Sequence, residues 1–496
     1  MRAAALLLLL ASAARGDDRV RAFFEETGGH ELADALARIE APALAELPFG
    51  QVAIDGARVE GWIESDGRIR TGLFAVRRFE GPVAPLHPHE ALRAFAMARA
   101  PDLSPLLAHW VAALQAGDGK GARRAWTLLA RRDDLRTALL RALGAEWPSA
   151  WEEGRRRDRA LAALRAMDAL AADAFWRGYV ARRRAYVEAC SDAIPEPPGD
   201  DAPPERAVRL WVEGLRRMAP LYSCIIGTPP HFYGEPDAYM KLKEIGAPAY
   251  PTLVVAAEDP RTAGRGVSLG GEGEPSEVGF VASCLLGEML PYAEDGEILE
   301  RWIQDGAWRD ERSTALWFAR HGTRPHTLVT AAVELRGDPG AVDALRGLAD
   351  HPNAPVRISA AAALGELPAL ERLTDAVLAL ELPDATFYVL HRPPEGVAAA
   401  YWAAAVGDHG DRGMRLLASA MQRGGPGARI HVAGGLRGSR AGAEAVPLLE
   451  RCLDDPSPPV GVAAAGTLSR ISAGAIRVTA DDDALIAAAR AWVASR

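Results

Sequence analysis

The chain has 496 residues, a formal net charge of −9 at pH 7 and a hydrophobic fraction of 49%. This length exceeds what one compact core of up to about 250–300 residues can hold, so we expect two or more domains or a repeat array. The hydrophobic content excludes a disordered chain, and the negative charge argues against a general binder of nucleic acid or anionic membranes. Aromatic residues make up only 6%, and runs of Ala, Leu and Val favour helices over sheets.

Residues 1–16, MRAAALLLLLASAARG, have the pattern of a secretory signal peptide. One basic residue, Arg2, precedes an apolar run, and the small residues Ala14 and Gly16 stand where signal peptidase requires them. The run is too short to span a bilayer, and no later stretch is long and uncharged enough to do so. We therefore expect an exported protein, periplasmic or extracellular, whose mature chain is not inserted in a membrane. An uncleaved anchor is the alternative.

Residues 49–78 carry the clearest strand pattern of the chain. Two Asp-Gly dipeptides, at 55–56 and 66–67, each lie between runs of alternating polar and apolar residues. Asp-Gly supplies the positive φ that a type I′ hairpin turn requires. The segment therefore predicts a three-stranded β-meander.

From residue 88 to about 193 the apolar residues recur with the period of an α-helix. The segment 195–205, PEPPGDDAPPE, is rich in proline and acid and cannot continue a helix, so it predicts a domain boundary. We expect an N-terminal domain over 17–194, a linker over 195–205 and a second helical domain over 206–496.

A basic island falls on one long predicted helix. We expect it to form a solvated face, because charge-rich surface helices are common and long arginine stems cover apolar surface. Docking of an acidic partner, or of the acidic segment 195–205, is the alternative. The island comprises Arg155, Arg156, Arg157, Arg159, Arg165, Arg177, Arg182, Arg183 and Arg184.

Four cysteines, Cys190, Cys224, Cys284 and Cys452, are scattered without the close spacings of metal sites or haem attachment. A bridge between Cys190 and Cys224 is conceivable in an oxidising compartment. We expect instead that all four are buried small hydrophobic residues. The cysteines therefore predict neither a metal nor a cofactor.

The second predicted domain repeats itself. Residues 341–367 match 445–471 at an offset of 104, about three units of 35 residues. Each stretch has an Asp-rich turn, prolines where a helix would begin, and alanines with a leucine on one face; Asp350 would cap the helix in the first stretch. Degraded copies of the second helix stand at 396–406 and 427–436, and a further match at 278–290. One such unit cannot bury its apolar face alone, so the repeats predict a stack.

This pattern resembles HEAT repeats, including their PBS-lyase type, and the resemblance covers roughly residues 235–474. It implies a mainly α fold, an α-solenoid of HEAT-like repeats, preceded here by the small β-meander and helices. In this family the turn Asp and an Arg of the second helix form a ladder between neighbouring units. Asp350 and Arg357 match that pattern, and so does Arg429, whereas Gly461 stands where the last unit should have Arg.

Catalytic motifs are weak. Two His-Glu dipeptides begin at His30 and His89, but Asp34 and Arg93 stand where an HExxH zinc site needs its second histidine. His87 and His89 flank a proline and lack a third ligand, so they indicate an ordinary helix entry.

Two loops of the second domain are candidates for contact with a partner. The Gly-rich loop 261–277 lacks the GK[ST] ending and the GxGxxG spacing of phosphate-binding loops, and we expect an insertion on a binding face. The loop 227–239 places His231, Phe232 and Tyr233 between proline and glycine, where aromatic side chains can serve recognition.

These observations predict a non-enzymatic scaffold that binds another protein, with no cofactor, metal or nucleic acid. One alternative is a hydrolase or lyase that uses His87, His89 and His231 in or beside the N-terminal module. A second alternative is a structural envelope component. The candidate partner surface comprises Arg357, Arg429, His431, His231, Phe232 and Tyr233.

Overall fold

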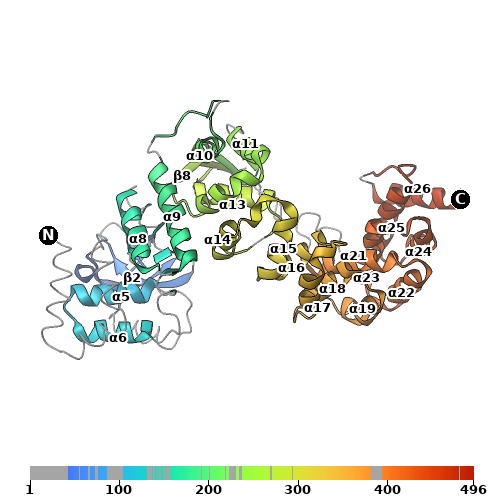
Figure 1. Ribbon diagram of the computed structural model, residues 1–496, viewed down its shortest axis with the longest axis horizontal. Coiled ribbons are helices and arrows are strands. Elements are labelled where there is room, and N and C mark those ends of the chain that lie inside the picture. Colours follow the sequence, from blue (N-terminus) through green and yellow to red (C-terminus); the bar gives the residue numbers. More distant parts are fainter. Residues whose placement is uncertain are drawn as a thin grey trace. The chain divides into compact units, whose positions relative to one another are not determined.

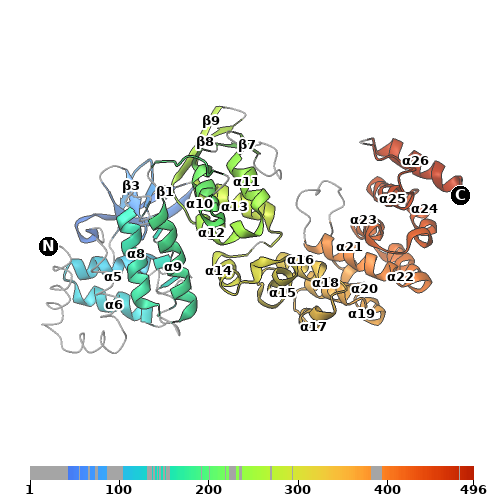
Figure 2. The same cartoon turned by 45° about the horizontal axis from the view of Figure 1, so that its top comes forward.

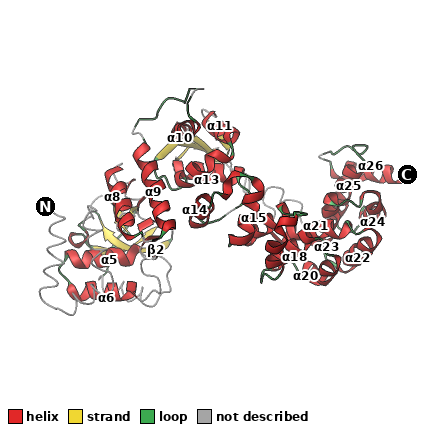
Figure 3. Ribbon diagram, in the orientation of Figure 1, coloured by secondary structure: helices red, strands yellow, loops and turns green. Residues whose placement is uncertain are grey.

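A computed structural model describes residues 43–54, 56–64, 67–72, 76–86, 104–130, single positions between 137 and 151, 157–171, 173–190, 193–199, 202–217, 219–222, 231–233, 237–268, 271–292, 294–380, 382, 394–479 and 481–496. Within 217–237 and 262–276 it describes the backbone alone. The fold is mainly helical with a small antiparallel sheet near the N-terminus, as predicted (Figures 1 and 3). The signal segment, His87, His89 and Cys224 lie outside the described residues.

The chain divides into two compact units. The first comprises Met1–Tyr222 and His231–Leu285, and the second Ser223–Pro230 and Leu286–Arg496. The predicted linker 195–205 therefore lies inside the first unit, and residues 206–285 do not belong with the repeats that follow. The reason is that α10 (Pro204–Gly214) and α9 (Ala174–Ala189) both pack on α12 (Tyr250–Ala256), which holds the two sides of the proline-rich segment in one core.

The predicted meander is confirmed and extends to five strands. The sheet order is β4-β3-β2-β1-β5, and the register pairs Phe49 with Trp62. Gly56 and Gly67 have φ of +77° and +76° at the two predicted turns. Phe49 and Trp62 pack against the ring of His109 on the helix Ser104–Gln115, with centroid distances of 5.0 and 4.8 Å. The strands are β1 (Phe49–Ile54), β2 (Ala57–Ile63), β3 (Arg68–Arg70), β4 (Val76–Arg78) and β5 (Ala84–Pro85).

Helices complete the first unit around an aromatic core in which the Trp110 and Trp126 rings lie 4.8 Å apart. Besides α9, α10 and α12, the helices are α5 (Ser104–Gln115), α6 (Gly119–Ala130), α8 (Arg157–Leu170) and α11 (Asp237–Ile245). A further helix, α13 (Val278–Met289), begins in this unit.

A second sheet, which the sequence did not predict, includes the segment expected to be an insertion. Residues 262–277 form a hairpin of β8 (Thr262–Ser268) and β9 (Gly271–Glu277). With β6 (Ala219–Tyr222) and β7 (His231–Tyr233) they make a mixed sheet of order β7-β6-β8-β9. The sequence hid these strands because glycine disfavours strands and obscures the alternation of apolar residues.

The second unit is built from helix pairs. Helices α16, α18, α21, α23 and α25 pack one against the next, and α17, α22 and α24 flank this row (Figures 1 and 2). The helices are α14 (Gly296–Gln304), α15 (Glu311–His321), α16 (Pro325–Glu334), α17 (Val342–Ala349), α18 (Ala354–Leu364), α19 (Leu367–Arg372), α20 (Thr374–Leu378), α21 (Pro394–Gly407), α22 (Gly410–Arg423), α23 (Pro426–Gly435), α24 (Val446–Cys452), α25 (Pro458–Ile471) and α26 (Asp482–Ala494). We call α16, α18, α21, α23 and α25 the inner row.

Small residues let the inner row pack closely. A Cβ on Gly435 of α23 would overlap the carbonyl oxygen of Ala400 on α21, so only glycine permits this approach. Trp402 is fully buried and donates its Nε1 hydrogen to the Leu370 carbonyl at 3.0 Å. At the start of α18 the cap is Asn353, whose Oδ1 accepts from the Val356 N–H, and not Asp350 as predicted. The apolar core continues along the row from Ile358 to Ala489.

Candidate functional site

Arg429 forms a contact between neighbouring helix pairs. Its guanidinium makes two bonds to the Asp455 carboxylate, Nε to Oδ2 at 2.8 Å and Nη2 to Oδ1 at 3.0 Å. Its Nη1 donates to the Gly424 carbonyl at 2.9 Å. Arg429 lies on α23 and Asp455 in the turn before α25, so the pair ties one helix pair to the next, as a rung of the predicted ladder would.

Arg357, the equivalent residue of α18, makes the contact with nearby backbone carbonyls but no ion pair with a neighbouring helix pair among the described residues. Its Nη1 donates to the carbonyls of His351 and Pro352 at 2.8 and 2.6 Å, and not to Asp350. Both arginines thus reach the carbonyl five residues earlier in the chain. An acceptor placed like Asp455 would fall near residue 383, outside the described residues.

The imidazole of His431 on α23 packs against α21. A Cβ on Gly396 of α21 would stand 2.7 Å from Cε1 of His431, so glycine makes room for this imidazole. His431, Arg357 and Arg429 are each half-buried. All three candidate residues of the inner row therefore have structural contacts that a partner would have to share.

His231, Phe232 and Tyr233 are not brought together with those residues. They form β7 in the first unit and pair with residues 219–221 of β6. Their side chains are outside the described part of the structure, and so are His87 and His89.

Asp408 joins the opposite ends of the inner helices. Its carboxylate accepts from Arg336, which follows α16, and from the hydroxyl of Ser439 and the N–H of Arg440 at 3.2 and 2.6 Å. Asp408 itself follows α21, and Ser439 and Arg440 follow α23. The row is therefore held by polar contacts at both ends of its helices.

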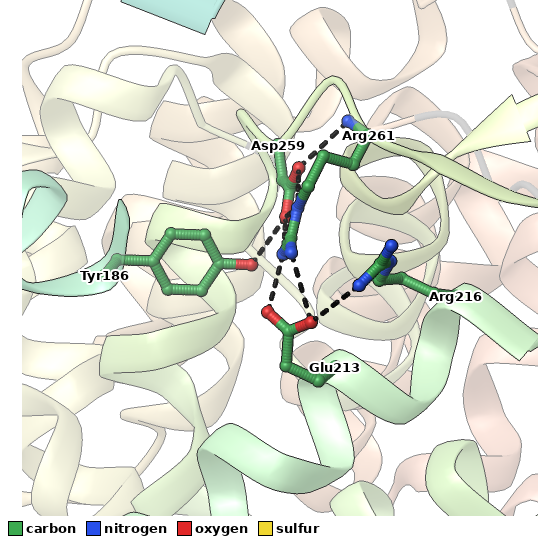
Figure 4. Close-up of polar contacts among 5 residues, drawn as sticks. All are labelled: Tyr186, Glu213, Arg216, Asp259 and Arg261. Carbon is green, nitrogen blue, oxygen red and sulfur yellow. Dashed lines mark hydrogen bonds and ion pairs between the residues drawn. The ribbon is translucent and has the colours of Figure 1, made fainter. Parts of the chain in front are cut away.

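A buried polar network occupies the first unit (Figure 4). Arg261 lies between two carboxylates, with Nη2 at 2.7 Å from Glu213 Oε1 and 2.6 Å from Asp259 Oδ2. The hydroxyl of Tyr186 donates to Asp259 at 2.8 Å, and Arg216 Nη1 donates to Glu213 at 3.3 Å. The Asp259 side chain is fully buried, and the exposed fractions of Glu213 and Arg261 are 7% and 11%.

A second ion pair lies beside this network. Glu258 accepts from Arg183, from the indole N–H of Trp147 at 3.1 Å and from the hydroxyl of Tyr179 at 3.3 Å. Arg183 is fully buried, so the prediction of a solvated arginine face was wrong for this residue, although Arg165, Arg177 and Arg184 are exposed. The island also divides between α8 and α9, because Asp173 caps the start of α9.

The electrostatics of the network favour fixed charges. Burial and the nearby Asp259 carboxylate raise the pKa of Tyr186, which keeps its hydroxyl protonated as a donor. Burial alone would lower the pKa of Arg261, but hydrogen bonds to Asp259 and Glu213 outweigh burial and raise it. Three carboxylates face three guanidinium groups, so the cluster is neutral. Such an arrangement holds structure in place.

The network anchors the β8–β9 hairpin. Arg261 precedes β8 directly, and its carbonyl accepts from the Val278 N–H at 2.8 Å just after β9. The Asp259 carbonyl accepts from the Gly279 N–H at 2.8 Å, and a Cβ on Gly279 would stand 2.7 Å from the Ala257 carbonyl oxygen. The two arms of the hairpin therefore enter and leave at one fixed point.

Sequence reasoning missed this network. The one signal, the charged residues of EDPR at 258–261 after an apolar run, does not reveal partners that lie between 48 and 111 residues earlier in the chain. Cys190 and Cys452 are buried free thiols, as predicted, and burial raises the pKa of Cys190, whereas Cys284 is only half-buried.

Within the part of the chain that the structure describes, no group of three His, Cys, Asp or Glu side chains could hold a metal ion. No helix there combines the length and apolar character needed to cross a bilayer. Comparison with protein families, curated proteins and solved structures gives no match to this chain.

Proposed function

We propose that the second unit is a HEAT-like α-solenoid and that the protein is an exported scaffold that binds another protein through it. The observation that carries the proposal is the inner row itself, in which five helices at intervals of one repeat pack one against the next. In a stack of this kind each helix pair packs mainly on its neighbours, so the array grows along one direction. It therefore offers an extended surface for a partner.

Polar contacts between units support the same proposal. Arg429 and Asp455 join two pairs at one end of the helices, and Asp408 joins three inner helices at the other. Contacts of this kind fix the curvature of a stack, and a fixed surface loses little conformational entropy on binding. The apolar run and small residues of 1–16 support export.

Site-specific photo-crosslinking in the producing cell tests this function. A photo-reactive residue would replace Arg415 of α22 or Arg470 of α25, and as a control Arg165 of α8; all three are exposed. We expect one protein to be captured, saturably, from positions of the second unit and not from Arg165. Capture from Arg165 alone, or from none of the positions in a folded chain, would contradict the proposal.

A further inference from the structure

Four exposed arginines stand at the ends of α23 and α25. Arg437 and Arg440 follow α23, Arg470 belongs to the last turn of α25, and Arg477 follows that helix. Among the described residues, none of their guanidinium groups has a hydrogen bond or an ion pair. We call these four residues the arginine edge.

Most described arginines of this unit have a partner, although Arg320, Arg372 and Arg415 also have no hydrogen bond or ion pair among the described residues. Arg412 makes two bonds of 3.0 Å to Glu371, Arg429 binds Asp455, and Arg490 binds Asp454 at 2.7 Å. Acidic residues outnumber basic ones over 286–496, so a shortage of carboxylates does not explain the arginine edge. Asp408 lies beside Arg440, but its carboxylate already accepts from Arg336, Ser439 and the N–H of Arg440.

Two hydrogen bonds between and beyond the helices bring the four residues to one side of the stack. The Thr467 hydroxyl of α25 donates to the Ala433 carbonyl of α23 at 2.9 Å, within the last turn or so of each helix. The Ser469 hydroxyl donates to the Ile476 carbonyl at 2.7 Å, which folds the chain back and sets Arg477 beside the end of α25. Arg437 and Arg470 thus lie at matching positions of neighbouring helices.

We propose that the arginine edge binds an acidic, extended segment of a partner protein, a proposal that rests on the scaffold function above. Arginine binds carboxylates in a planar, bidentate manner, and unpaired guanidinium groups keep this capacity free. A cation near a helix C-terminus also interacts favourably with the helix dipole, but one residue in each last turn would serve that purpose. Arg440 and Arg477 lie beyond the helices.

The spacing of the helices fixes the spacing of the ligand. Packed helices lie about 8–10 Å apart, and an extended chain advances about 3.3 Å per residue. Carboxylates three residues apart therefore meet the ends of α23 and α25. The segment should carry at least two Glu or Asp residues three positions apart, a spacing that a peptide with Glu at every third position offers in several registers.

Fluorescence anisotropy with the full chain tests the proposal. The probe is a labelled twelve-residue Ser/Gly peptide with Glu at every third position, and the comparison peptide has the same composition with its glutamates adjacent. We expect the spaced peptide to bind more tightly, with an affinity that falls as salt is added. The double variant Arg437→Glu/Arg470→Glu should weaken binding about tenfold, because each attractive pair becomes repulsive.

The matched control is Arg320→Glu/Arg372→Glu, which makes the same charge change at two other exposed positions of the unit. It should change binding less than twofold. Equal loss in both variants, equal binding of the two peptides, or no binding overturns the proposal. Melting curves, and the milder Arg437→Gln/Arg470→Gln variant, show whether the fold is kept. If photo-crosslinking captures a partner while the peptide fails to bind, the arginine edge fails and the scaffold function stands.

Discussion

The Asp259→Asn variant probes the buried network most sharply. The variant keeps the shape of the side chain but removes the negative charge of its carboxylate. In the wild type, Oδ2 of this carboxylate lies 2.6 Å from Nη2 of Arg261 and accepts a hydrogen bond from the Tyr186 hydroxyl. Arg261 and Arg216 would then share the single carboxylate of Glu213, leaving an uncompensated buried positive charge. Removing one partner of a buried ion pair costs about 3–5 kcal/mol.

Amide hydrogen exchange measures this loss of stability at the base of the β8–β9 hairpin. The N–H groups of Val278 and Gly279 donate to Arg261 and Asp259, so local opening of the base exposes both. A loss of about 3–5 kcal/mol lowers their protection by about two to three and a half orders of magnitude, since about 1.4 kcal/mol is a factor of ten.

The control is Asp295→Asn. The exposed fraction of Asp295 is 67%, and its surface pair with Arg324 is worth about 0–1 kcal/mol. If Val278 and Gly279 keep wild-type protection in Asp259→Asn, or lose it equally in Asp295→Asn, the network does not hold the hairpin.

Two further substitutions test the inner row. Trp402→Ala removes a fully buried indole and its bond to Leu370, and should destabilise the second unit by about 3–5 kcal/mol, measured as lost exchange protection over α18 and α21. Trp308→Ala, at a half-buried indole, should cost clearly less; an equal cost would refute a tightly packed row. Ser359→Ala should stabilise α18 by about 1 kcal/mol, because the buried Ser359 hydroxyl has no hydrogen-bond partner among the described residues. A lower stability of this variant would show that the hydroxyl has a partner after all.

Local signals in the sequence predicted the parts of the fold that local physics decides. Gly56 and Gly67 turn the first sheet where Asp-Gly requires positive φ. The repeated prolines predicted where α18 and α25 begin, and the repeated alanines predicted the face that each helix buries against its neighbour. Arg429 could be picked out because it stands at the repeat position of Arg357, although its partner Asp455 could not be named.

Contacts that depend on tertiary structure were beyond the sequence. Arg183 looked like its exposed neighbours, and only the placement of Glu258, 75 residues away, makes it a buried residue. The match at 278–290 extended the predicted repeats back to about residue 235, which lies in the first unit. Asp259 in fact faces Arg261 and Tyr186, so its carboxylate serves the base of the hairpin.

Hydrogen exchange of the full chain, alone and with the partner captured by photo-crosslinking, tests the central claim most directly. We expect the partner to increase protection along the inner row, most strongly at the ends of α23 and α25, and to leave the β1–β2 meander unchanged. Protection confined to residues 43–285, with no change over 286–496, would contradict the claim that the second unit binds the partner.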